Sequence, residues 1–125
     1  MYSIASDSLR KLVTIKIVGM LTHEQVKALY AEEHEAIRRM GCRLGEHYAL
    51  VDLTECNLQL QDVAAAFQKE MNGSAKAKRL ALYTGSSLSR MQVRRITKRE
   101  DAQIFATREE AIAWLFGDDE VRQVA

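Results

Sequence analysis

The sequence contains no proline and no apolar run that approaches the roughly 20 residues of a membrane-spanning helix. Residues 1–12 also lack the basic segment and apolar block of a secretory signal peptide. The charges nearly cancel, to a formal net charge of +1, so no overall field draws the protein toward nucleic acid or a membrane surface. These absences lead us to expect a cytoplasmic, globular protein that does not insert into membranes.

Cysteine is scarce, with only Cys42 and Cys56, and the two residues flank a predicted strand at 47–53. About seven extended residues at about 3.3 Å each would hold them roughly 20 Å apart, which is beyond the reach of a disulfide. They also lack the Cys-x-x-Cys spacing of a redox or zinc site. We interpret them as two free thiols, buried or half-buried.

Motifs for catalysis and metal binding are missing as well. His34 precedes Glu35 without the second histidine of a zinc-protease helix, and His23 and His47 have no partner at ligand spacing. The sequence has no Gly-x-Ser-x-Gly nucleophile elbow. We therefore expect no cofactor and no metal site, and no set of residues supports catalysis.

What the sequence does contain is a regular alternation of apolar runs and amphipathic segments. Residues 12–18 alternate between apolar and polar side chains, as in a half-buried strand, whereas 47–53 suit a strand covered on both faces. Thr22 with Gln25, and Thr107 with Glu110, form capping signals that open helices. The predicted strands are 2–5, 12–18, 47–53, 79–84 and 102–106, and the predicted helices are 22–40, 59–72, 85–98 and 108–116.

This order predicts an α/β fold with a mainly parallel sheet of about five strands, residues 2–5 being an antiparallel edge, and four helices. We expect residues 1–117 to form a single domain and 118–125 to form a frayed acidic tail. In the third helix, Arg90, Arg94 and Lys98 repeat every four residues and form one stripe, opposite Leu88 and Ile96. The second helix has the clearest apolar stripe, made of Leu60, Val63, Ala64, Phe67 and Met71.

Three stretches carry a resemblance to a known family. They are "IKIVGMLTHEQ", "ALVDLTECNL" and "AQIFATREEAIAWLFG", which lie in order between residues 12 and 117. In order and spacing they resemble the STAS/SpoIIAA-like superfamily, which includes bacterial anti-sigma-factor antagonists, STAS domains of sulfate transporters and small stand-alone bacterial proteins. The resemblance implies a non-catalytic regulatory or protein-interaction module that works through the loops at the carboxyl ends of the strands.

The sequence departs from the antagonists at one position that matters for regulation. Where they carry Asp-Ser-x-Gly with a phosphorylated serine, this chain has residues 60–63, "LQDV". We therefore expect no phosphorylation in the turn 54–62 other than at Thr54. The resemblance places a partner surface on this turn, at Asn57, Gln59, Gln61 and Asp62. Some relatives, and the related lipid-binding CRAL-TRIO domains, imply an alternative, a carrier or sensor that holds a small apolar or anionic ligand between helices and sheet.

The segment from Met71 to Arg99 contains several basic residues and no acidic residue. A solvated helix face would explain them, and so would a docking patch for an acidic partner protein or for an acidic helix of a second copy in a homodimer. We do not expect nucleic acid, because no aromatic residue is interleaved among the basic ones. The basic residues are Lys76, Lys78, Arg79, Arg90, Arg94, Arg95, Lys98 and Arg99.

The stretch "YTGSSLSR" at 83–90 places small polar residues where a helix begins beyond a parallel strand. Free helix N–H groups, hydroxyls and arginines could hold an anion there. An ordinary serine-rich helix cap is the alternative. The candidate anion-binding residues are Gly85, Ser86, Ser87, Ser89, Arg90 and Arg94.

Glu33 is anomalous because it falls inside the apolar stripe of the first helix, between Tyr30 and Ile37. A buried carboxylate there would have a raised pKa. Alternatively, Glu33 lies at the rim of the stripe, beside Arg38 or Lys27.

Two further side chains have undecided roles. Asp52 follows the apolar run of the central strand, and we interpret it as a residue that closes a turn rather than one that performs chemistry. Trp114 lies off the stripe of Ile112 and Leu115. It either fills a space between helices or is an exposed aromatic used in self-association.

Overall fold

The structure is a computed structural model that describes residues 1–43, 45–71, 77–97 and 99–117. Within these residues the sheet has five strands in the order β1-β2-β3-β4-β5, with β1 antiparallel to β2 and the others parallel. The predicted fold class is confirmed. The elements are β1 (Tyr2–Asp7), β2 (Leu12–Gly19), α1 (His23–Arg39), β3 (Tyr48–Cys56), α2 (Gln61–Met71), β4 (Arg79–Tyr83), α3 (Ser87–Ile96), β5 (Ala102–Phe105) and α4 (Arg108–Phe116).

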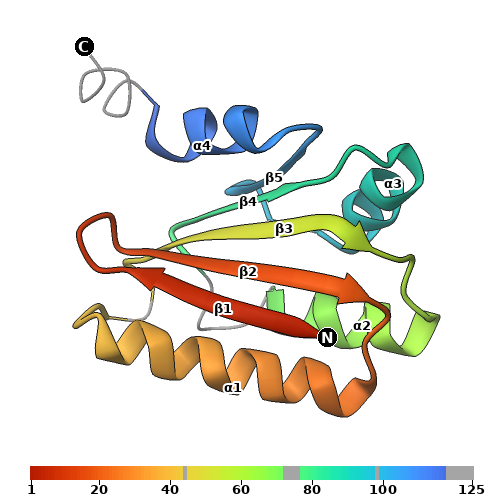
Figure 1. Cartoon of the computed structure of the whole chain (residues 1–125), viewed down its shortest axis with the longest axis horizontal. Helices are drawn as coiled ribbons and strands as arrows, with labels where there is room; N and C mark the ends of the chain where they lie inside the picture. Colours follow the sequence, from red (N-terminus) through yellow and green to blue (C-terminus); the bar gives the residue numbers. More distant parts are fainter. Residues whose placement is uncertain (44, 72–76, 98, 118–125) are drawn as a thin grey trace.

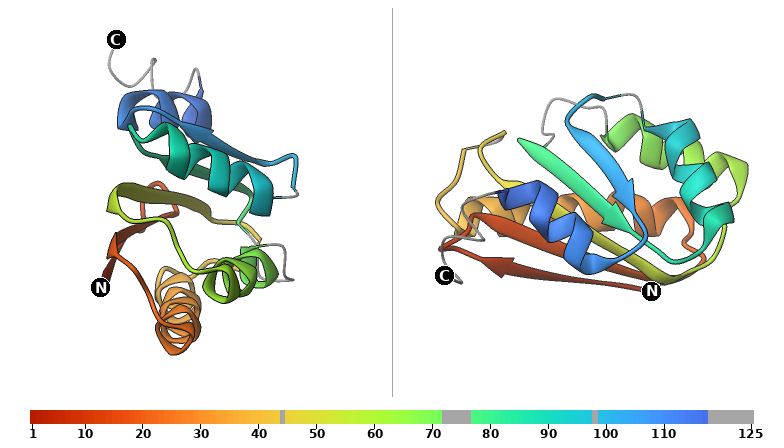
Figure 2. Two further views of the ribbon diagram at one scale, coloured as in Figure 1. Left: turned by 90° about the vertical axis from the view of Figure 1, so that its right-hand side faces the viewer. Right: turned by 90° about the horizontal axis from the view of Figure 1, so that it is seen from above.

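Helices cover both faces of the sheet. In Figure 1, α1 and α2 lie below the sheet and α4 lies above it, and in Figure 2 the view from above shows α4 in front of the strands and α1 behind them. The larger core joins α1, α2 and α3 to one face through residues such as Val26, Phe67 and Val93. The smaller core joins α4 to the other face through Ile112 and Leu115.

The strands follow the alternation read from the sequence. In β2, Val13, Ile15 and Ile17 enter the larger core, while Thr14 and Lys16 on the other face are half-buried. In β3, Ala49, Val51 and Leu53 face the larger core and Leu50 faces the smaller one, as expected of a strand covered on both faces. The apolar side chains on this face of β2 and β3 form one core with α1, α2 and α3, so these three helices cover the same face of the sheet.

Helix α1 begins where its capping residues predict. The Thr22 hydroxyl accepts a hydrogen bond from Gln25 N, and the Gln25 side chain accepts one from Thr22 N, so both halves of the capping box are present. The helix ends before Gly41, whose φ of +77° is a conformation that glycine adopts without strain.

Two boundaries differ from the prediction near the carboxyl ends of the strands. Strand β3 continues to Cys56, because a register shift between Lys16 and Val18 of β2 lets the pairing resume with Glu55 and Cys56. Helix α2 begins at Gln61, so the assignment of Leu60 to its buried stripe was wrong. Leu60 precedes the helix and is 60% exposed.

Some expectations fall outside the described residues, namely those for Lys76, Lys98 and the tail 118–125. The single-domain assignment of residues 1–117 likewise stays a prediction. Among the described helices, none is both long and apolar enough to cross a membrane.

Phe67→Ala should lower the free energy of unfolding by about 3–5 kcal/mol. Phe67 is buried in the middle of α2 and contacts the Tyr30 ring edge-on at a centroid distance of 6.3 Å, so truncation removes packing between two helices. Urea titration measures the change, and Ala65→Ser on the exposed side of the same helix is the control, with an expected change below about 0.5 kcal/mol. A Phe67→Ala effect as small as that of the control would contradict the packing described.

Candidate functional site

Gln59 joins two loops at the carboxyl ends of the parallel strands to helix α3. Its side-chain amide donates to Gly19 O at 3.1 Å, and its side-chain oxygen accepts from Leu21 N at 2.9 Å, which ties the β3–α2 loop to the β2–α1 loop. Its backbone N–H donates to the Gln92 side chain at 3.1 Å, and the Gln92 amide donates back to Gln59 O at 3.0 Å. Because Gln92 lies in α3 (Ser87–Ile96), this helix is thereby fixed to the same two loops.

Exposed apolar side chains project from the segments that Gln59 joins. We name Met20, Leu58, Leu60, Leu88 and Met91 the carboxyl-edge surface, and each is between 45% and 62% exposed. In Figure 1 the arrows of β2 and β3 point toward this end of the molecule, where α1 and α2 begin. This surface was not predicted from the sequence, in which Leu60 continues the apolar stripe of α2 and Leu88 lies opposite the basic stripe of α3.

The predicted partner residues lie on or beside this surface, but not all of them are available to a partner. Asn57, Gln61 and Asp62 are exposed, whereas Gln59 is half-buried and engaged in the hydrogen bonds above. The role of Gln59 is therefore to hold the loops in place. Partner binding by the other three stays a prediction.

The predicted anion-binding residues satisfy one another in large part. The Ser86 hydroxyl caps α3 by accepting from Ser89 N at 3.2 Å, and Ser86 N donates to the Thr84 hydroxyl at 3.2 Å. Arg90 turns back and donates to Thr84 O at 2.9 Å, while Arg94 is exposed. These contacts are those of the serine cap that the sequence left open as an alternative.

The basic segment does not form one surface patch in the part of the chain described. Arg79 donates to Trp114 O at 3.0 Å and lies 5.5 Å from the centre of the Trp114 ring. Trp114 is half-buried and also contacts Phe105, so it fills a space beside β5. The Arg99 side chain is only 5% exposed. On α3, Arg94 and Arg95 are the exposed arginines.

Asp52 lies inside β3 rather than at its end, which corrects the prediction that it closes a turn. Its carboxylate accepts from the Thr54 backbone N–H at 2.9 Å and from the Thr54 hydroxyl at 2.6 Å. Partial burial acts to raise the pKa of Asp52, but hydrogen bonds from Thr54 and from the Tyr83 hydroxyl outweigh it and hold the pKa below its usual range. Asp52 thus stabilises the irregular stretch where the β2–β3 register shifts.

A cavity of about 260 Å³ lies between the sheet and helices α1, α2 and α3. Most of its wall is apolar. One end reaches the carboxyl edge at Gln59 and Gln92, and the other reaches Glu33 on α1, Glu70 on α2 and Arg99 before β5. The apolar lining includes Ile15, Ile17, Leu29, Val51, Phe67 and Leu82.

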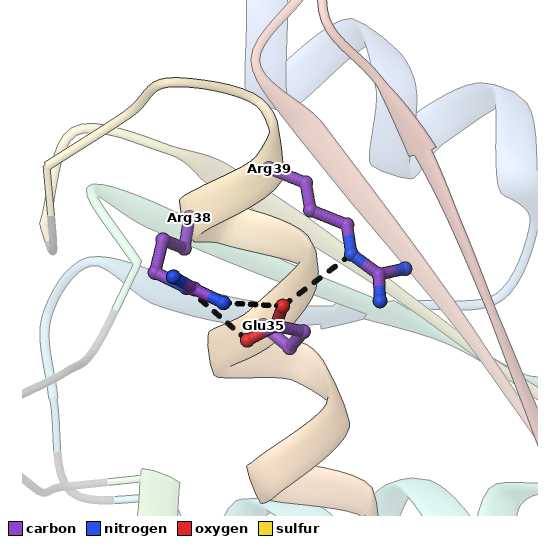
Figure 3. Close-up of polar contacts among 3 residues, drawn as sticks. All are labelled: Glu35, Arg38 and Arg39. Carbon is purple, nitrogen blue, oxygen red and sulfur yellow. Dashed lines mark hydrogen bonds and ion pairs between the residues drawn. The ribbon is translucent and has the colours of Figure 1, made fainter.

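Glu33 lies in the wall of this cavity and is 6% exposed, so its placement at the helix rim beside Arg38 or Lys27 is wrong. Figure 3 shows that Arg38 pairs with another carboxylate: its guanidinium lies 2.6 Å from Glu35, and that of Arg39 lies 3.4 Å from the same carboxylate. No hydrogen bond or ion pair within the described residues reaches the Glu33 carboxylate.

Burial raises the pKa of Glu33 to about 7, and the neighbouring Glu70 carboxylate adds to the effect. Arg99 opposes the rise, but its guanidinium is directed elsewhere. It donates to Asp101 at 2.5 Å, to Met71 O at 3.3 Å and to Ala77 O, and so joins the end of α2 to the starts of β4 and β5. His47, buried nearby, has a pKa lowered to about 4 by burial and by Arg99.

Taken together, the architecture defines an α/β domain with one antiparallel edge strand, a mainly parallel sheet and helices on both faces. A family model described as SpoIIAA-like matches residues 12–116. The chain belongs to the SpoIIAA-like family, which confirms the resemblance found in the sequence.

Two solved structures share the fold. An uncharacterized protein from Shewanella loihica with a SpoIIAA-like fold is 23% identical, with a TM-score of 0.69 over 91% of this chain and 93% of that chain. The anti-sigma factor antagonist SpoIIAA in its unphosphorylated form is 20% identical, with a TM-score of 0.59 over 94% of this chain and 99% of that chain. A search of curated proteins finds no match.

Glu33→Gln should make the free energy of unfolding less dependent on pH. Below pH 4.5 both the folded and the unfolded wild type hold the Glu33 proton, whereas between pH 4.5 and about 7 only the folded state does, so stability falls as the pH rises. The variant should therefore gain about 2–3 kcal/mol relative to wild type between pH 5 and pH 8.

Urea titrations at the two pH values measure this gain. Glu32→Gln, which alters an exposed carboxylate one position earlier on the same helix, is the control and should show no comparable gain. An equal pH dependence in wild type and Glu33→Gln would mean that Glu33 titrates as it does in water.

Replacing chloride by phosphate at equal ionic strength tests the predicted anion site at 85–94. An occupied site should raise the melting temperature of the wild type by a few degrees, since charge-assisted contacts form at the helix start. Phosphate also stabilises proteins by exclusion from their surfaces, so the double variant Arg90→Ala/Arg94→Ala is the control. An equal shift in both proteins would leave only the serine cap.

Proposed function

We propose that this protein is a regulatory module that binds another protein through its carboxyl-edge surface. The observation that carries the proposal is the gathering of Met20, Leu58, Leu60, Leu88 and Met91 at one end of the sheet. Exposed apolar surface that is rimmed by polar residues is typical of protein interaction sites. Here the rim includes Asn57, Gln61 and Asp62.

The surface is preorganised, which favours recognition over incidental exposure. Reciprocal hydrogen bonds between Gln59 and Gln92 fix the β3–α2 loop to α3, and Asn57 N donates at 3.0 Å to Gly19 O, at the end of β2. Because the loops are already ordered, a partner would not have to order them on binding, and more of the contact energy would appear as affinity.

Charge indicates the kind of partner. Exposed Arg94 and Arg95 lie on the same helix as Leu88 and Met91, and the segment between Met71 and Arg99 contains no acidic residue. A partner with an apolar centre and an acidic border fits this combination, because complementary charges speed encounter and disfavour wrong partners. We therefore propose a protein partner with an acidic docking surface.

The family relation supports a role through protein contacts. The related anti-sigma factor antagonist is described by its name as acting on another protein. The phosphorylated serine of that mechanism has no counterpart here, since Gln61 and Asp62 occupy the corresponding stretch. We propose that binding by this chain is not switched by a phosphoserine in this turn.

Leu60→Asp and Leu88→Asp should each weaken partner binding by more than about tenfold, because a charge would be buried without a partner at the centre of the contact. Tagged wild type and variants, incubated with host lysate, would be compared by quantitative mass spectrometry for the proteins they retain. Leu9→Asp is the matched control, since Leu9 is 97% exposed in the β1–β2 turn, at the opposite end of the sheet.

A protein retained by wild type and Leu9→Asp but lost from both other variants would support the proposal, provided that the variants melt like wild type. Equal retention by all four proteins would contradict it. A wild-type dimer in sedimentation that Leu60→Asp and Leu88→Asp dissociate would also contradict it, in favour of self-association through the same surface.

A further inference from the structure

We propose that the cavity between the sheet and helices α1, α2 and α3 binds a small aliphatic amine, with Glu33 as the counter-ion of its ammonium group. This site is distinct from the carboxyl-edge surface, which is formed by other side chains, and it does not depend on the protein partner. The family resemblance implied a small apolar or anionic ligand, whereas this proposal names a cationic head group.

The size and the lining of the cavity suit a compact apolar body. Its volume of about 260 Å³ exceeds the roughly 150 Å³ of an engineered apolar cavity that takes up benzene. Ile15, Val51 and Leu82 from the sheet and Leu29 and Phe67 from the helices contribute to the wall. A ligand with an alkyl chain would exchange water for these apolar contacts, which is favourable in proportion to the area buried.

The polar end supplies one unpartnered acceptor. Glu33 is 94% buried, lines the cavity and receives no hydrogen bond from the described residues. A buried carboxylate without a partner is costly, and its charge is stabilised when a cation donates to it. An ammonium ion bound beside Glu33 would therefore offset the free-energy cost of burying its carboxylate.

The surrounding charges favour a cation over an anion. Arg99, the buried base at this end, is already engaged by Asp101 and two backbone carbonyls. Glu70 adds a second carboxylate, and Tyr30 contributes no positive charge. His34 and Lys69 are exposed on the border of the cavity, where water screens them, and His47 stays neutral near pH 7 because burial lowers its pKa.

The test compares hexylamine, hexanol and hexanoate by calorimetric titration into the full-length protein at pH 6 and pH 8. Hexylamine should bind, and hexanoate should bind at least tenfold more weakly. Because an ammonium ion pairs with ionised Glu33, hexylamine affinity should rise by up to about tenfold between the two pH values. Glu33→Gln should lose that rise and weaken hexylamine at least tenfold, while hexanol binding stays the same.

Ala49→Leu is a second variant that leaves Glu33 intact and fills space in the cavity wall. It should weaken hexylamine and hexanol alike, which separates binding in the cavity from binding to surface carboxylates. Absence of saturable hexylamine binding to the wild type would overturn the proposal. Undiminished hexylamine binding by Glu33→Gln or by Ala49→Leu, or hexanoate binding as tight as that of hexylamine, would overturn it as well.

Discussion

The hydrogen bonds of Gln59 are the interaction on which the candidate surface depends. A glutamine side chain has both a donor and an acceptor, so Gln59 can satisfy Leu21 N and Gly19 O of one loop while its own backbone pairs with the Gln92 side chain. Three chain segments that are distant in sequence thereby become one rigid edge. The same two glutamines also line one end of the cavity.

The burial of Glu33 is a feature that stability alone does not explain. Helix α1 places Glu33 at a core position, where an apolar residue would pack without the cost of burying a carboxylate. The arginines that could neutralise it are directed elsewhere, Arg38 and Arg39 to Glu35 and Arg99 to Asp101. Perturbed titratable groups in a cavity are more often found at functional sites than in ordinary cores.

Much of the fold could be predicted from the sequence, because each strand and helix has local periodicity and capping residues such as Thr22 and Thr107 define where helices start. The site was harder to predict, because its residues lie where periodicity stops. Leu60 continues the stripe of α2 by spacing but lies before the helix, and the extension of β3 to Cys56 depends on a register shift that has no local signal. The burial of Glu33 could not be predicted, because spacing alone does not say that Arg38 pairs with Glu35 rather than with Glu33. The cavity could not be predicted either, because it depends on how α1, α2 and α3 lie relative to one another.

If a protein partner docks on the carboxyl-edge surface, amide hydrogen exchange of the protein with and without its captured partner should reveal it. We expect slower exchange on binding at residues 20–22, 57–61 and 86–92, and no change in the β1–β2 turn around Leu9. Protection confined to that turn or to α4, with the carboxyl edge exchanging as in the free protein, would contradict it.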